Sequence, residues 1–132
     1  MATSIKKCVP MIYVPDVAAT LDWYLSIGFK EIARYSDDGL VNFGVVSFGK
    51  TEILINMHGK RGEHDASLWL STNKIDKLYE LLKSRQVEAA LTGAKDGIDF
   101  VEAINNTFYG ARQFGIRDLN GYMLYFIQQL KR

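Results

Sequence analysis

The feature of this 132-residue chain that most constrains its fold is a repeated order of elements. Hydrophobic periodicity predicts a strand, a helix and three further strands in the first half, and the same order returns in the second half. Two equivalent units of about 60 residues indicate pseudo-twofold symmetry. In each unit one helix can cover only one face of a four-stranded sheet. The other face must therefore meet a partner or enclose a ligand.

The first unit is predicted to begin with a strand at residues 8–14. Asp16 is placed to cap the helix that follows, because its carboxylate can accept hydrogen bonds from the first turn. Gly28 ends this helix. Turn residues then separate three more strands, which are predicted at about 29–36, 40–48 and 51–57.

The second unit repeats this order after a polar linker at residues 58–65. A strand at 67–72 leads into a helix that Asn73 is expected to cap. The helix runs on until Gly93 and Gly97 break it. Three strands complete the unit, predicted at 98–105, 111–117 and 122–130.

The composition limits the kind of partner. The formal net charge is +1, whereas nucleic acids and anionic membranes attract clustered Lys and Arg. No apolar stretch approaches the roughly 18 residues needed to span a bilayer, and the polar residues 1–7 do not resemble an export signal. The lone Cys8 cannot form an internal disulfide, so a cytoplasmic location is expected. We expect Cys8 to be a small buried hydrophobic residue.

Two local motifs accompany the repeat. The first contains Val14-Pro15-Asp16-Val17 and ends in Trp23-Tyr24-Leu25-Ser26-Ile27-Gly28-Phe29. The second is Tyr109-Gly110-Ala111-Arg112-Gln113-Phe114, followed by Arg117-Asp118-Leu119-Asn120-Gly121-Tyr122. In this order and spacing they resemble the vicinal oxygen chelate superfamily, which includes glyoxalase I, extradiol dioxygenases and bleomycin-resistance proteins.

The resemblance covers nearly the whole chain and implies an α+β fold. Two βαβββ units would form open half-barrels and assemble as a homodimer. The chain would be a single domain, 1–132, with units at about 5–58 and 66–130. Among members of the superfamily the metal-free bleomycin-resistance proteins are the most similar, because they combine an aromatic-lined cleft with a dimer that completes it.

The resemblance also implies where a metal would be held, with a His early in the first strand of each unit and a Glu in its last strand. In the first unit these positions are Val9 and Leu54. In the second they are Ser67, or Ala66 if the register shifts by one, and Tyr125. Divalent metals need imidazole, carboxylate or thiolate ligands. We therefore expect no metal, no cofactor and no metal-dependent glyoxalase or dioxygenase activity.

The only histidines are His58 and His64, and both lie in the predicted linker. With Glu63 and Asp65 they would form at most a surface metal site. Nothing beside them is expected to hold four ligands rigidly, so a solvated loop is the interpretation that we favour.

Strand alternation assigns the remaining candidates to faces. The face away from the helix receives aromatic, thioether, hydroxyl and amide side chains. This mixture is typical of a pocket for an organic ligand, although the core of a plain dimer would look the same. With two residues from the second motif, the predicted ligand-binding residues are Met11, Tyr13, Leu54, Asn56, Ser67, Trp69, Ser71, Tyr109, Arg112, Met123 and Tyr125.

Three residues qualify this list. Trp23, on the amphipathic first helix, is expected in the core. Arg112 fits a ligand contact and a structural ion pair equally well. Glu52 is the one acidic residue placed near the predicted cavity, which argues against a strongly cationic drug such as bleomycin as the ligand.

Three functions follow as alternatives. The first is a metal-independent protein that binds a small aromatic or amphipathic molecule, with resistance by sequestration as one role. The second is a lyase, isomerase or dioxygenase of the superfamily with non-standard metal ligands. The third is a structural or interaction subunit whose cavity is filled. The missing ligand side chains favour the first and the third, and an exposed Trp69 beside Tyr125 would favour the first.

Overall fold

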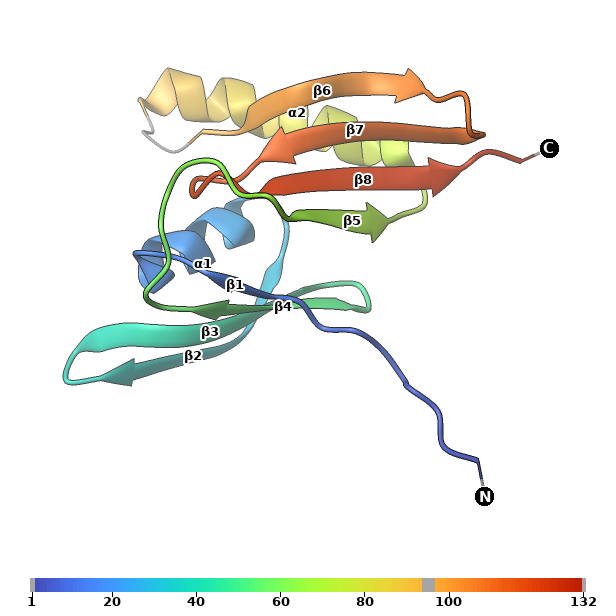
Figure 1. The fold of residues 1–132 in the computed structure, drawn as a ribbon. Helices are drawn as coiled ribbons and strands as arrows, with labels where there is room; N and C mark the ends of the chain where they lie inside the picture. The colour runs from blue at the N-terminus through green and yellow to red at the C-terminus, as the bar shows by residue number, and fades with distance from the viewer. Residues whose placement is uncertain (1, 94–96, 132) are drawn as a thin grey trace. The chain divides into compact units, whose positions relative to one another are not determined.

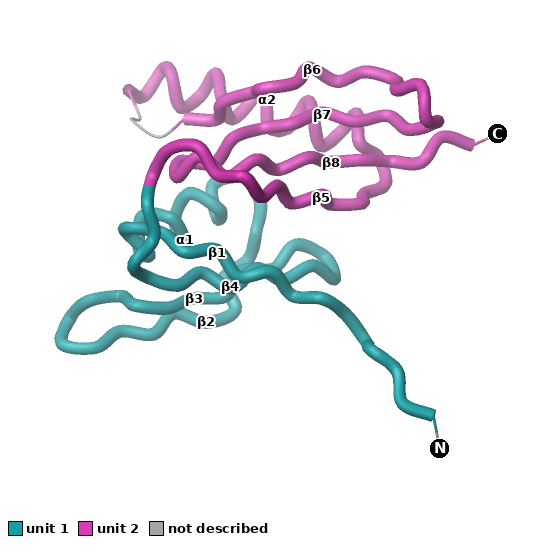
Figure 2. Tube along the Cα trace, viewed as in Figure 1, with its two compact units in different colours: residues 1–60 teal, residues 61–132 magenta. Residues whose placement is uncertain are grey.

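A computed structural model describes residues 2–93 and 97–131 of the chain. The chain divides into two compact units, residues 1–60 and residues 61–132, which Figure 2 colours separately. Each unit contains one helix and one four-stranded sheet. This confirms the predicted α+β fold of two βαβββ units.

Unit 1 consists of β1 (Met11–Tyr13), α1 (Val17–Ser26), β2 (Lys30–Asp37), β3 (Leu40–Phe48) and β4 (Thr51–Asn56). Its strands lie in the order β1-β4-β3-β2 (Figure 1), with β1 parallel to β4. The β2–β3 turn has positive φ at Asp38 (50°) and Gly39 (79°). Two positive φ angles are the requirement of a tight hairpin turn, which explains the Asp-Gly pair in the sequence.

Helix α1 packs closely on the sheet of unit 1. A Cβ atom at Gly44 would lie 2.6 Å from Leu21 Cδ2, so any side chain there would force Leu21 to move. Trp23 is 4% exposed, which confirms its predicted place in the core. Arg34 donates hydrogen bonds of 2.8 Å to Asp22 of α1 and to Glu31, and these bonds raise the pKa of Arg34. Close packing and an ion pair thus hold the helix against one face.

Unit 2 repeats the arrangement with β5 (Ser67–Ser71), α2 (Ile75–Thr92), β6 (Asp99–Asn106), β7 (Ala111–Arg117) and β8 (Met123–Gln129). The strand order β5-β8-β7-β6 matches that of unit 1, and β5 is parallel to β8. In the view of Figure 1, α2 lies behind this sheet. Within unit 2 the helix therefore covers one face of the sheet, and the opposite face, which no described helix of this unit covers, is the open face.

Aromatic side chains form the core between α2 and the sheet. Phe114 is fully buried and stacks on Phe126 with ring centroids 5.0 Å apart. Tyr79 of α2 meets Phe114 and Phe100 edge-on, at 5.0 and 5.4 Å. Lys83 places its ammonium 4.1 Å from the centre of the Phe100 ring, a cation–π contact at the margin of the core.

The N-terminus of α2 differs from the prediction. The capping residue is Lys74, which has a left-handed backbone conformation and no capping bond from its side chain. Instead Gln128 of β8 accepts a hydrogen bond of 2.9 Å from the backbone N–H of Ile75. The prediction that Asn73 caps the helix was therefore wrong. A side chain distant in the sequence satisfies the first turn of the helix, and local patterns do not reveal such a partner.

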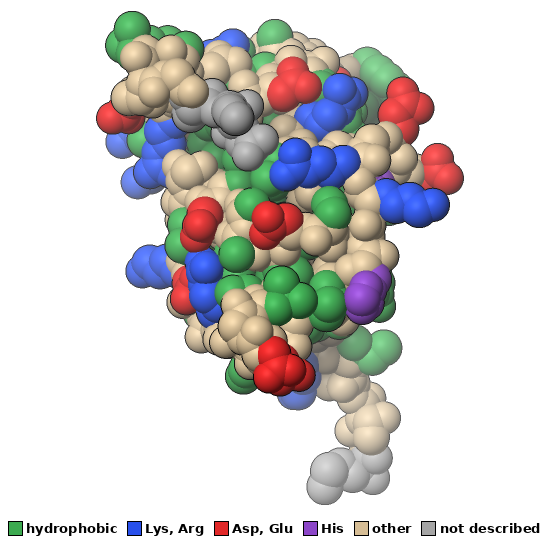
Figure 3. All heavy atoms as spheres, turned by 90° about the vertical axis from the view of Figure 1, so that its left-hand side faces the viewer, with side chains coloured by type: hydrophobic (Ala, Val, Ile, Leu, Met, Phe, Trp, Pro, Cys, Tyr) green, Lys and Arg blue, Asp and Glu red, His purple; other side chains and the backbone are tan. Residues whose placement is uncertain are grey.

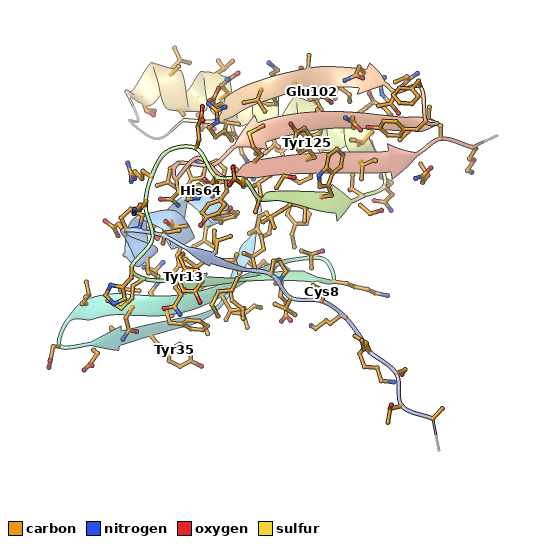
Figure 4. The ribbon with its side chains drawn as sticks, in the orientation of Figure 1. Cys8, Tyr13, Tyr35, His64, Glu102 and Tyr125 are labelled. Atoms are coloured by element: carbon orange, nitrogen blue, oxygen red, sulfur yellow. The ribbon has the colours of Figure 1, made fainter. Side chains whose placement is uncertain are left out.

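The start of the chain also differs from the prediction. Strand β1 begins at Met11 rather than at residue 8. Just before it, Pro10 O accepts a hydrogen bond of 2.9 Å from Leu54 N of β4. Cys8 lies on the segment before β1 (Figure 4) and is exposed. The expectation of a buried cysteine was wrong because the sheet ends before it reaches residue 8.

The surface shows no grouping of charge by sign on the face seen in Figure 3, where acidic and basic side chains are interspersed. Within residues 2–93 and 97–131, none of the helices has the length and apolar character needed to cross a membrane.

Candidate functional site

The open face of unit 2 carries the side chains that the sequence assigned to it. Along β5, Ser67, Trp69 and Ser71 are exposed, while Leu68 and Leu70 between them are half-buried. Along β8, Leu124 and Phe126 are buried on the helix side. The alternation confirms the predicted register, and Ser67 rather than Ala66 lies on the open face. The open-face candidates in these two strands are Ser67, Trp69, Ser71, Met123 and Tyr125.

Trp69 and Tyr125 form a stacked pair at the centre of this face. They are directly paired across β5 and β8, with ring centroids 4.4 Å apart and planes 13° apart. The indole Nε1 of Trp69 donates a 3.0 Å hydrogen bond to Ser67 Oγ, which fixes the orientation of the ring. Trp69 nevertheless remains 51% exposed. A large aromatic side chain is thus held in one orientation and left accessible.

The row of paired residues that begins with Trp69 and Tyr125 continues across the sheet. Tyr125 pairs with Gly115 of β7, and Gly115 pairs with Glu102 of β6. A Cβ atom at Gly115 would lie 2.7 Å from Tyr125 Cε1, so the tyrosine ring occupies the space that a side chain there would need. Figure 4 labels Tyr125 and Glu102 on the sheet of unit 2. One row therefore contains two stacked rings, a glycine that the second ring covers, and a carboxylate.

Hydrogen bonds from amide groups orient Glu102. Its Oε2 accepts bonds from Gln113 Nε2 (2.7 Å) and Asn105 Nδ2 (3.2 Å). Gln113 in turn accepts a hydrogen bond from the hydroxyl of Tyr109, a candidate residue in the turn before β7. The sequence missed Glu102 because a bulge lies between Phe100 and Glu102 and breaks the alternation of β6.

The open face of unit 1 carries the other predicted residues. Met11 and Tyr13 are 38% and 49% exposed, and Leu54 and Asn56 are half-buried beside them. Asn56 Nδ2 lies 3.8 Å from Met11 Sδ. Glu52 forms an ion pair with Lys7 and is therefore not a free acidic group. The row through Tyr13 and Asn56 continues to Phe43 and Tyr35, so this face also carries aromatic rings.

The repeat allows the two open faces to be compared position by position. In both units a row of paired residues crosses the sheet. It passes from the first strand of the unit to the fourth, the third and the second. In unit 1 this row is Met11, Leu54, Val45 and Ala33. In unit 2 the same row is Trp69, Tyr125, Gly115 and Glu102. The shared fold therefore requires neither the rings nor the carboxylate at these positions.

Arg112 lies apart from the other candidates. It pairs with Gln128 on the helix side of the sheet, and its Nε and Nη2 donate bonds of 3.1 and 2.9 Å to Asp76 Oδ1 of α2. Its Nη1 donates a 2.9 Å bond to Asn106 Oδ1. Of the two interpretations left open by the sequence, the structure contains the ion pair.

The positions implied for metal ligands do not fit a divalent metal. Tyr125 is stacked against Trp69, the Ser67 hydroxyl accepts the indole N–H, and Leu54 and Val9 offer no donor atom in their side chains. Across residues 2–93 and 97–131, no group of three His, Cys, Asp or Glu side chains is arranged to hold a metal ion.

The linker histidine His64 is part of a packed loop. Its ring stacks on Tyr122 with centroids 3.8 Å apart and planes 6° apart, and its Nε2 lies 3.1 Å from Asn120 O. Gly62 N also donates to Asn120 O (3.1 Å). His58 is exposed and has a positive φ of 74°. His64 is thus packed within the loop, whereas His58 is exposed.

Two surface depressions lie away from the candidate residues. One of about 370 Å³ adjoins the β7–β8 turn near Arg117 and Asp118, and one of about 190 Å³ adjoins Asp16 at the start of α1. No predicted ligand-binding residue lines either depression.

Comparison with solved structures places the fold among known ones. TioX from Micromonospora sp. ML1 is 20% identical with a TM-score of 0.73, over 95% of this chain and 99% of that one. A bleomycin-binding protein complexed with bleomycin is 17% identical with a TM-score of 0.72, over 95% and 99%. A glyoxalase-related enzyme from Clostridium phytofermentans is 19% identical with a TM-score of 0.73, over 97% and 98%.

A search of curated protein sequences found no match. The model of the Glyoxalase/Bleomycin resistance protein/Dioxygenase superfamily, in contrast, matches residues 5–126, nearly the whole chain. The repeated βαβββ order, the parallel pairing of first and last strands, and this match agree. The chain belongs to the Glyoxalase/Bleomycin resistance protein/Dioxygenase superfamily.

Proposed function

We propose that this chain is a metal-independent small-molecule-binding protein whose ligand carries an aromatic group that packs on the open face of unit 2. The observation that carries the proposal is the stacked pair of Trp69 and Tyr125, fixed by Ser67 and half exposed. Exposed aromatic rings on a rigid sheet offer a large contact area at little entropic cost.

The chemistry of the superfamily's metal positions supports binding over metal-dependent catalysis. Ser67 and Tyr125 are engaged with Trp69, and neither offers an imidazole or a carboxylate. A relative of the same fold is a bleomycin-binding protein solved with bleomycin, so this fold can serve binding itself. Sequestration of a toxic compound is one role that such binding would support.

We further propose that the chain works as a single domain in a cytoplasmic homodimer. Exposed apolar residues on the open face of unit 1, Met11, Tyr13 and Tyr35, would gain from a partner surface. The exposed thiol of Cys8 suits a reducing compartment.

The proposal can be tested by titrating ¹⁵N-labelled protein with 1-naphthylmethanol, a neutral aromatic probe. We expect saturable shifts of the Trp69 indole N–H and of β5 and β8 amides, because the probe should pack on these strands. The Trp23 indole N–H, on a buried residue of α1, is the internal control and should stay in place. Absence of saturable shifts at Trp69, or equal shifts at Trp23, would count against the proposed site.

A further inference from the structure

We infer that the ligand of unit 2 carries a protonated amine next to its aromatic group and that Glu102 binds this cation. The inference rests on the proposed binding function and adds the chemical class of the ligand. It follows from the position of Glu102, from the hydrogen-bond partners of its carboxylate and from the comparison with unit 1.

The position of Glu102 brings it within reach of a ligand on the aromatic pair. Trp69, Tyr125, Gly115 and Glu102 are paired in one line across four adjacent strands. Adjacent strands are about 4.8 Å apart, so the backbones at Tyr125 and Glu102 are roughly 10 Å apart. The ring of Tyr125 lies over Gly115, which has no side chain, and so extends toward Glu102. A group of a few atoms attached to a ring at Tyr125 therefore spans this distance.

The carboxylate of Glu102 is oriented but not neutralised. Both of its hydrogen bonds come from uncharged amide groups and reach Oε2. Among the described residues Oε1 accepts no hydrogen bond, and it is not a buried atom, so a ligand can approach it. No Lys or Arg of the described residues forms an ion pair with Glu102, and Arg117 on the same face pairs with Asp99. A protonated amine would supply the missing positive charge.

The comparison with unit 1 shows that the fold does not need this charge. Ala33 occupies the matching position on β2, next to a bulge like the one that precedes Glu102. The alanine there shows that this row of the sheet can form without a carboxylate. The neighbouring rings also favour a cation, because aromatic faces attract positive charge. The acidic residue is therefore best explained by a positively charged group that it meets on the open face.

The test compares three probes that share one ring system and differ in charge. These are 1-naphthylmethylamine, 1-naphthylmethanol and 1-naphthoate, each titrated into the purified chain at neutral pH and followed by calorimetry and NMR. We expect the amine to bind at least about tenfold more tightly than the alcohol, because a hydrogen bond between charged groups exceeds a neutral one by about this factor. The carboxylate should bind most weakly.

Two variants assign the preference to one residue. Glu102→Gln keeps the shape and the amide bonds but removes the charge, so the amine and the alcohol should bind almost equally. Glu80→Gln, on the exposed surface of α2, removes the same charge from the helix that covers the other face and should leave the preference intact. Glu102→Asp keeps the charge and should retain part of the preference, which controls for a folding defect in the glutamine variant.

The outcomes separate the two proposals. If the alcohol binds at Trp69 but the amine has no advantage, or keeps its advantage in Glu102→Gln, the inference about Glu102 is overturned and the binding function stands. A preference for 1-naphthoate would overturn it as well. If none of the probes perturbs Trp69, the proposed function itself fails.

Discussion

The ring of Trp69 lies flat against the ring of Tyr125, with centroids 4.4 Å apart, and its indole N–H is held by the hydroxyl of Ser67. One residue of this pair comes from the first strand of unit 2 and the other from its last strand. Because Trp69 is half exposed and Trp23 is buried, the two tryptophans of the chain should respond differently to a ligand.

We expect 1-naphthylmethanol to quench the fluorescence of Trp69 and to leave that of Trp23 largely unchanged. Trp69→Phe should remove most of the quenching and weaken binding by about 0.5–1.5 kcal/mol, the usual value of an aromatic stacking contact. The matched variant Trp23→Phe should keep the quenching but lose about 1–3 kcal/mol of stability in a urea titration, because it leaves a space in the core. A Trp69→Phe protein with unchanged quenching would place the ligand elsewhere.

Elemental analysis of the protein, purified without chelators, should find far less than one equivalent of Zn, Ni, Mn or Fe. The reason is the donor set, since Val9, Leu54, Ser67 and Tyr125 replace the ligands of the superfamily's metalloenzymes. One metal per chain that is lost in Tyr125→Phe would revive the alternative of an enzyme with unusual ligands.

Light scattering at micromolar concentration should give twice the monomer mass. The exposed apolar side chains of unit 1 favour burial against a second copy, and a stable interface should bury more than about 1,000 Å² in total. Introducing charge with Tyr13→Glu should shift the mass toward the monomer, whereas Leu91→Glu, at the exposed end of α2, should not. A monomeric wild-type protein would contradict the proposal.

The Arg112–Asp76 ion pair should contribute to stability and not to binding. In a double-mutant cycle of Arg112→Ala and Asp76→Ala we expect a coupling of about 0.2–1 kcal/mol in urea unfolding, as for other partly exposed pairs. Affinity for 1-naphthylmethanol should not change in either variant, because the pair lies on the helix side of the sheet. A loss of affinity in Arg112→Ala alone would return this residue to the ligand site.

Gln128→Ala should destabilise unit 2 by about 0.5–2 kcal/mol, because it removes the acceptor for the first N–H of α2. Gln129→Ala, one residue further along and exposed, is the control and should have almost no effect. Urea unfolding and the helical circular dichroism signal measure both variants. Equal effects of the two substitutions would show that the cap has no energetic role.

The sequence predicted the parts of the fold that depend on local periodicity. The order of elements, the inward Leu124 and the outward Trp69 all follow from strand alternation, and the structure confirms them. The sequence could also have placed Arg112 on the helix side. Arg112 alternates in phase with Phe114 and Ile116, which are buried on that side.

What the sequence did not predict depends on departures from regular geometry or on distant contacts. Strict alternation from Phe100 puts Glu102 on the helix side, and only the bulge between them turns it to the open face. Gln128 caps α2 from across the sheet, where no local pattern of Asn73 could indicate it. The expectation for Cys8 failed because the length of β1 is set by its pairing with β4.

The parallel pairing of β5 with β8 also has a consequence for folding. The hairpins β6–β7 and β7–β8 join neighbours in the chain, whereas β5 meets β8 only after nearly the whole unit has been made. Closing so long a loop is entropically costly and slow, so we expect this strand to dock last. Trp69 and Tyr125 would then meet only at the final step, and an incompletely folded chain would have no aromatic platform to offer.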